Sequence, residues 1–147
     1  MKRFFFRAIA FGLTFSGLKS ILYLLERVVF NYGKSYSFFE SVVLSFFFGA
    51  FLGFINLKNI RRVILVSSIY LLINIIISWD GNYEGVEIVY ILNSASLPFA
   101  SLFDQLIFRL MGSSPYYIFN LITFSCLTLD LMISLKIVEY FKERFLS

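Results

Sequence analysis

Two charged residues, Lys19 and Asp130, interrupt long runs of apolar side chains. A charge near the middle of a bilayer costs at least about 2.5–3.5 kcal/mol on insertion scales, so such a residue needs a partner or a function. At 1.5 Å of rise per residue, Lys19 lies about 16 Å from the N-terminal start of its apolar segment. Asp130 lies about 12 Å from the C-terminal end of its own segment. If these two ends are at the same membrane surface, the two residues differ in depth by only a few Å. A lysine side chain is long enough to cover the difference. We therefore predict that Lys19 and Asp130 pair across a helix bundle.

Such a pair has two possible roles. It could be a structural ion pair that fixes the register of two helices, or a coupling or translocation site for a transported species. In a third interpretation the two residues do not pair. Lys19 then extends outward to the membrane surface and Asp130 stays protonated.

The residues needed for most enzymatic chemistry are missing from the sequence. There is no histidine and one cysteine, Cys126, in an apolar run, so the sequence offers neither the commonest general base nor a metal-ligand cluster. No H-E-x-x-H or G-x-S-x-G motif occurs, and no carboxylate pair lies at helical spacing deep in an apolar segment. We expect no catalytic residue, no metal and no cofactor, and an enzyme is the least supported class.

The composition is that of a membrane protein. Of 147 residues, 59% are apolar and 15% charged, against about 25% charged in a soluble domain. The net charge of +4 does not indicate nucleic-acid binding, because no basic stripe with interleaved aromatic residues occurs. The sequence predicts a single all-α integral membrane domain over residues 1–147.

Four segments are apolar and long enough to cross a bilayer, which takes about 20 residues. They predict a four-transmembrane-helix bundle, in which Pro115 immediately precedes the last helix, a position that proline tolerates. The predicted spans are residues 8–30, 38–57, 63–79 and 116–138.

The distribution of lysine and arginine predicts the orientation. Three basic residues precede or begin the first span, three lie between the second and third spans, and three lie at the C-terminal end, which makes nine on one side. Since basic residues collect on the cytoplasmic side, both termini are expected to be cytoplasmic. We expect an uncleaved first span because Arg7 interrupts the apolar run of a signal peptide and no A-x-A-like site follows. The composition suggests a multi-pass protein of the bacterial inner (plasma) membrane.

The outward loop, residues 80–115, contains a helical pattern over residues 97–111. Its apolar residues recur on one side and its polar residues on the other, with Ser96 as the expected N-cap and Pro98 in the first turn. We predict an amphipathic helix that lies in the membrane interface. Two alternatives are a re-entrant segment that breaks at residues 93–96, and a fifth span over residues 86–111.

Every predicted span has one small or polar face. In lipid, helices associate through close backbone contact and interhelical hydrogen bonds, so these faces should turn toward other helices. We expect the first two spans to form a hairpin within one chain, and a homo-oligomer is the alternative. The residues assigned to helix–helix packing are Gly12, Ser16, Ser20, Ser41, Ser45, Gly49 and Gly53, and the other intramembrane polar residues are Asn74, Asn120, Thr123 and Ser134.

With no catalytic motif, the sequence favours a protein that binds another membrane protein, as an accessory or assembly subunit or as an immunity-type protector. Its partners would then be the lipid bilayer and that membrane protein. The alternative is a small oligomeric transporter or channel that uses Lys19 and Asp130. The outward recognition surface is expected to consist of Asn93, Asp104, Gln105 and Arg109.

Overall fold

The computed structural model describes residues 1–30, 37–55, 57, 59–79, 83–112 and 116–145. The described part of the chain is helical apart from short connections. The helices are α1 (Lys2–Phe30), α2 (Phe38–Phe54), α3 (Ile60–Ile77), α4 (Tyr83–Ser96), α5 (Ala100–Met111) and α6 (Tyr116–Phe145).

Local side-chain chemistry sets several helix ends. Ser37 begins α2 with a capping box, in which its hydroxyl accepts from the Glu40 backbone N–H and the Glu40 carboxylate accepts from the Ser37 N–H. The side chain of Asn59 caps α3 by accepting from the Arg62 N–H. Gly112 ends α5 with a φ of 71°, a left-handed conformation that glycine adopts without strain.

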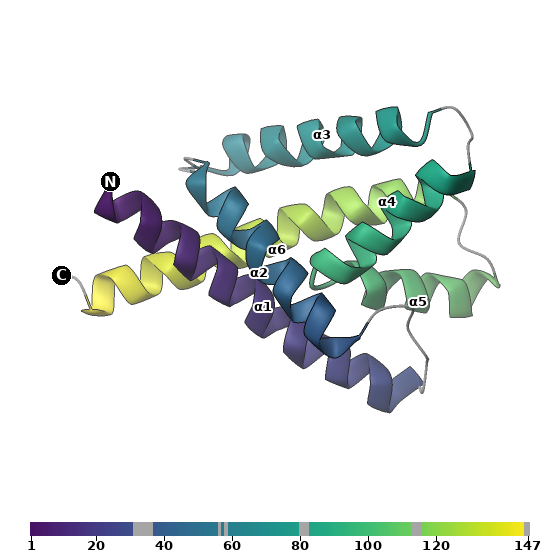
Figure 1. Ribbon diagram of the computed structural model, residues 1–147, viewed down its shortest axis with the longest axis horizontal. Helices are drawn as coiled ribbons and strands as arrows, with labels where there is room; N and C mark the ends of the chain where they lie inside the picture. Colours follow the sequence, from purple (N-terminus) through teal and green to yellow (C-terminus); the bar gives the residue numbers. More distant parts are fainter. Residues whose placement is uncertain (31–36, 56, 58, 80–82, 113–115, 146–147) are drawn as a thin grey trace.

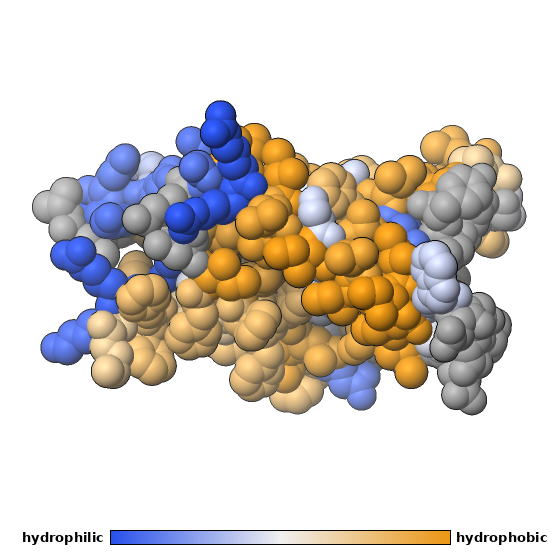
Figure 2. Space-filling view, turned by 90° about the horizontal axis from the view of Figure 1, so that it is seen from above, coloured by the Kyte–Doolittle hydropathy of each residue, from blue (hydrophilic) through white to orange (hydrophobic). Residues whose placement is uncertain are grey.

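The helices form a bundle with both chain termini at one end (Figure 1). α1 runs away from that end, α2 returns beside it, α3 runs out again and α6 comes back. Figure 2 shows hydrophilic surface gathered at the end that holds the termini and apolar surface over most of the remainder. This distribution suits a membrane protein, because the apolar surface can contact lipid and the hydrophilic end can contact water.

By length and composition, α1, α3 and α6 can each cross a membrane, and α4 with α5 is a bent apolar pair. The chain is therefore consistent with a membrane bundle of three to four spans. α2, the predicted second span, is a shorter apolar helix of 17 residues that ends at Phe54. The first and last helices are longer than predicted, since residues 2–7 and 139–145 continue them with charged side chains.

The closest packing joins α1 and α2, and glycines make it possible. A Cβ added at Gly49 would lie 2.7 Å from the carbonyl oxygen of Phe11, and one at Gly53 would lie 2.7 Å from the Cα of Ala8. Gly12, on α1, meets Phe46 at similarly short range. The two backbones thus approach closely at three points, in the manner of small-residue contacts between membrane helices.

α4 and α5 form a hairpin whose tip lies inside the bundle. The two helices are bent by 116° at residues 97–99, which turns α5 back toward the end from which α4 came. Pro98 explains the break, because it has no backbone N–H and disfavours helical conformation in the residue before it. The tip is buried, with Leu97 at 0% exposure in the main hydrophobic core beside Phe15 and Leu127.

The hairpin corrects the prediction of a helix over residues 97–111 capped by Ser96. Ser96 is the last residue of α4, where its hydroxyl donates to the Leu92 carbonyl, and α5 begins at Ala100 without a side-chain cap. The sequence pattern did identify the apolar and polar sides of this helix. It placed the helix outside the bundle, whereas its N-terminal end is inside.

The predicted outward recognition surface is wrong for two of its four residues. Asn93 and Asp104 are buried, at 0% and 3% exposure, because the polar side of the hairpin faces the other helices. The apolar side chains of Phe103, Phe108 and Leu110 are exposed instead. This distribution suits a helix whose outer side contacts lipid and whose inner side contacts protein.

Candidate functional site

Lys19 holds the C-terminal end of α4. Its ammonium nitrogen donates to the carbonyl oxygen of Ser94 at 2.5 Å and lies 3.4 Å from that of Leu97, and the side chain is fully buried. The last carbonyls of a helix have no partner within the helix and carry the negative end of its dipole. A buried cation at this position satisfies both the hydrogen bonds and the charge.

Two serines of α2 cover the remaining carbonyls of this helix end. The Ser41 hydroxyl lies 3.1 Å from the Ala95 oxygen, and the Ser45 hydroxyl lies 2.9 Å from the Ser96 oxygen and 3.2 Å from that of Ala95. The small-residue face of α2, which the sequence assigned to helix packing, therefore contacts two other parts of the bundle. Its serines bind the tip of the hairpin, and its glycines contact α1.

Asp130 of α6 lies on the other side of the break. It is fully buried, attracts Lys19 electrostatically and faces the backbone N–H of Phe99, where α5 begins. Among the described residues, neither carboxylate oxygen has a partner in hydrogen-bond geometry. Lys19 thus faces the negative end of α4 and Asp130 the positive end of α5. Direct contact between the two side chains stays a prediction.

Glu26, near the C-terminal end of α1, is buried close to the start of α5. The Ser101 hydroxyl lies 2.8 Å and 2.6 Å from its two carboxylate oxygens. Glu26 follows Lys19 by seven residues, a spacing that returns to the same helix face and could have identified it. It brings a second carboxylate to the first turn of α5.

Two tyrosines link the hairpin to polar groups. Tyr70 of α3 donates a short hydrogen bond to the Asn93 side-chain oxygen, and Tyr90 of α4 donates to the Asp104 carboxylate at 2.8 Å. The ring of Tyr90 also packs on Phe119 of α6, with centroids 4.9 Å apart. These contacts connect the hairpin to α3 and α6.

The other predicted residues lie outside the charged contacts of the tip. Ser16 and Ser20 are half-buried and donate to carbonyls of their own helix, as Thr123 does while fully buried.

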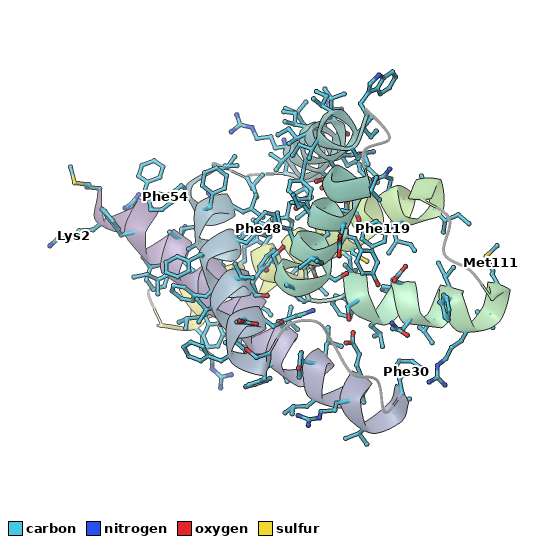
Figure 3. The ribbon with its side chains drawn as sticks, turned by 45° about the vertical axis from the view of Figure 1, so that its right-hand side comes forward. Lys2, Phe30, Phe48, Phe54, Met111 and Phe119 are labelled. Atoms are coloured by element: carbon cyan, nitrogen blue, oxygen red, sulfur yellow. The ribbon has the colours of Figure 1, made fainter. Side chains whose placement is uncertain are left out.

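Gln105 is half-buried, and Arg109 is exposed, donating to the Phe30 carbonyl at the end of α1. Figure 3 shows that Phe30 and Met111, the ends of α1 and α5, lie at the same end of the molecule, opposite Lys2. Asn74, Asn120 and Ser134 are buried on the inner sides of α3 and α6.

Acidic side chains outnumber basic ones in the interior of the bundle. Among the described residues, the buried Lys, Arg, Asp and Glu side chains are one base and three acids: Lys19, Glu26, Asp104 and Asp130. No group of three or more His, Cys, Asp or Glu in the described part of the chain could hold a metal ion.

Comparison with known proteins finds no family model, no curated protein and no solved structure that matches this chain.

Proposed function

We propose that this chain is a small membrane transport protein that moves protons across the bilayer, with Asp130 as the group that binds the proton. The observation that carries the proposal is the charged break of the α4–α5 hairpin. Interrupted helices inside a membrane are tolerated only where protein or water covers them, and they are typical of ion and solute sites.

In this proposal the chain crosses the membrane four times, through α1, α2, α3 and α6, with both termini in the cytoplasm. The hairpin enters from the outside and turns back near the middle of the bilayer. Exposed basic residues at the ends of α1, α3 and α6 support this orientation, including Lys2, Arg61 and Arg144. A bacterial inner membrane is the expected location.

The chemistry assigns separate tasks to the two central charges. Lys19 is held by two carbonyl oxygens and stabilises the end of α4, so it is a positioning residue. Asp130 has neither a donor in hydrogen-bond geometry among the described residues nor an exposed surface. A buried carboxyl group can hold a proton as a neutral acid, and the ammonium group of Lys19 can balance the charge that remains after the proton leaves. Asp130 can therefore alternate between the two states.

The function is tested by proton flux into liposomes that contain the purified protein and a pH-sensitive dye. A potassium gradient with valinomycin sets an inside-negative potential, and proton entry acidifies the interior. We expect flux above that of empty liposomes, and its loss in Asp130→Asn. Glu139→Gln is the matched control, because this carboxylate lies on the same helix and is exposed, and it should leave the flux unchanged.

Flux no greater than that of empty liposomes, from correctly folded protein, would refute the proposal. Binding to another membrane protein, the function favoured by the sequence, remains a prediction. It would replace proton transport if the chain showed no flux but co-purified in fixed stoichiometry with one membrane protein in mild detergent.

A further inference from the structure

Three packed helices, α3, α4 and α6, carry buried polar atoms without hydrogen-bond partners in the described structure. We call this group the polar seam, and it consists of Ser67 and Asn74 on α3, Asn93 on α4, and Asn120, Asp130 and Ser134 on α6. All six residues are less than 9% exposed. Inside a bilayer, neither lipid nor the protein contacts described here satisfy these atoms.

The three helices bring the seam residues to one region. α3 packs along α6, and α4 contacts α3. Tyr70, which lies between Ser67 and Asn74 on α3, binds Asn93, and the ring of Tyr90 joins α4 to Phe119, the neighbour of Asn120. The seam therefore passes the tip of the hairpin rather than lying on separate surfaces.

The seam is long and extends to both sides of Asp130. From Asn120 to Ser134 the rise along α6 is about 21 Å, against a hydrocarbon thickness of about 30 Å. α6 begins at the end of the bundle opposite the chain termini and runs toward them, so Asn120, in its second turn, comes before Asp130 and Ser134 comes after it along this direction. A single small ligand would not cover this length.

The unpartnered atoms indicate what occupies the seam. They include amide nitrogens that donate (Asn74, Asn93), oxygens that accept (Asn120, Asp130) and hydroxyls that do both. A bare cation would satisfy only the acceptors, and an anion only the donors. Water donates and accepts, and buried water typically bridges polar groups of this kind.

We propose that a file of bound water molecules fills the polar seam and connects Asp130 to both membrane surfaces, as the route by which protons reach and leave it. The role as a proton route rests on the proposed function, whereas the presence of water does not. Hydrogen-bonded water can pass a proton along without moving itself, so a narrow file is sufficient.

Water-edited solid-state NMR of the unsubstituted protein in lipid bilayers tests the proposal. Ser67 belongs to the seam and its neighbour Ser68 is exposed on the lipid side of α3, while Ser134 and Ser125 form a similar pair on α6. We expect magnetisation from water to reach Ser67 and Ser134 faster than Ser68 and Ser125. Equal or slower transfer to the two seam serines would overturn the proposal.

A chemical test uses Ser67→Cys and Ser68→Cys, each in a Cys126→Ala background, with a small charged methanethiosulfonate reagent. The cysteine thiolate attacks the reagent and forms a mixed disulfide as methanesulfinate leaves. Because the thiolate forms where water is present, the cysteine at position 67 should react about tenfold faster. Equal rates would contradict a hydrated seam. If the seam is hydrated but no proton flux is found, the water file stands and the transport function is rejected. If proton flux is found but the seam is dry, the transport function stands and the water file is rejected.

Discussion

A lysine buried among apolar helices needs several oxygen partners at once, and the tip of the hairpin supplies them to Lys19. Two carbonyl oxygens accept from its ammonium group, and Asp130 adds a negative charge across the break. Removing the ammonium would leave the carbonyls and the carboxylate without compensation. Lys19 should therefore contribute more to stability than an exposed lysine does.

Lys19→Met is expected to destabilise the protein by about 3–5 kcal/mol, the range for removing one member of a buried charged group. Asp130→Asn should have a smaller destabilising effect. In a double-mutant cycle the two changes should show a coupling free energy of about 0.5–3 kcal/mol, because the two side chains attract each other electrostatically. Unfolding in micelles titrated with SDS measures all three variants.

The control for this cycle is Lys136→Met, which removes a lysine that is 82% exposed and should change stability by less than about 0.5 kcal/mol. If the effects of Lys19→Met and Asp130→Asn simply add, the two residues do not interact. If both single changes are harmless, the buried charges have no structural role.

Ser45→Ala should cost about 1–2 kcal/mol of unfolding free energy, because it leaves the carbonyls of Ala95 and Ser96 without this donor in a buried place. Ser68→Ala, at an exposed position of α3, should be close to neutral. The same SDS titration compares the two variants. Similar small effects would mean that the serines of α2 do not hold the hairpin.

At this scale the sequence identified Lys19 and Asp130, because a charge within an apolar run is conspicuous. It missed Glu26 because this residue lies near the end of its span, where a charge is ordinary. It misplaced Asn93 and Asp104 because polar residues between spans are usually exposed. These two residues are buried because the α4–α5 hairpin folds into the bundle. The spacing of apolar and polar residues in the sequence does not determine where the hairpin folds.

At the scale of the elements, the small residues of α2 show why one face can have two partners. Residues four apart on a helix drift by about 40° per step, so Ser41 and Gly53 differ by about 120° in direction. The serines at one end therefore meet α4 and the glycines at the other end meet α1. The same drift turns Ser16 and Ser20 of α1 partly away from α2, so the predicted stripe is only half in contact.

The two glycines Gly49 and Gly17 form a matched pair for testing the α1–α2 contact. Gly49→Ala places a Cβ 2.7 Å from the Phe11 carbonyl oxygen and should destabilise the protein by about 1–3 kcal/mol through overpacking. Gly17→Ala meets nothing within 4 Å and should be neutral or slightly stabilising, since alanine favours helix. Equal effects in SDS titration would contradict close backbone packing of the two helices.

The long apolar helices α1, α3 and α6 were predictable, because long apolar runs are local signals. The break at Pro98 was also visible as a polar stretch beside a proline. The direction of the chain after the break was not, because one sequence pattern fits an interfacial, a re-entrant or a crossing segment. The 116° bend and the buried tip exclude one continuous helix over residues 86–111, and they depend on contacts with α1, α2 and α6 that are distant in sequence.

At the scale of the whole molecule, the hairpin gives a thin bundle a polar centre. α1, α2, α3 and α6 surround a buried tip that carries the C-terminal end of α4 and the N-terminal end of α5. Buried charges on α1 and α6 face these two ends. The face seen in Figure 2 is largely apolar away from the end that holds the termini, as contact with lipid requires. The proposed function depends on this tip lying near the middle of the bilayer.

The depth of the hairpin in a lipid bilayer is the most direct test of this account. Nitroxide labels at Ile88, Phe103 and Met111, all exposed positions, report depth through collisions with oxygen and with a water-soluble relaxant. We predict that the label at 103 lies about 10 Å deeper than the label at 111, since eight residues of helix separate them. The labels at 88 and 111 should be shallow and on the same side of the membrane. Equal depth at 103 and 111, or labels at 88 and 111 on opposite sides, would contradict a re-entrant hairpin.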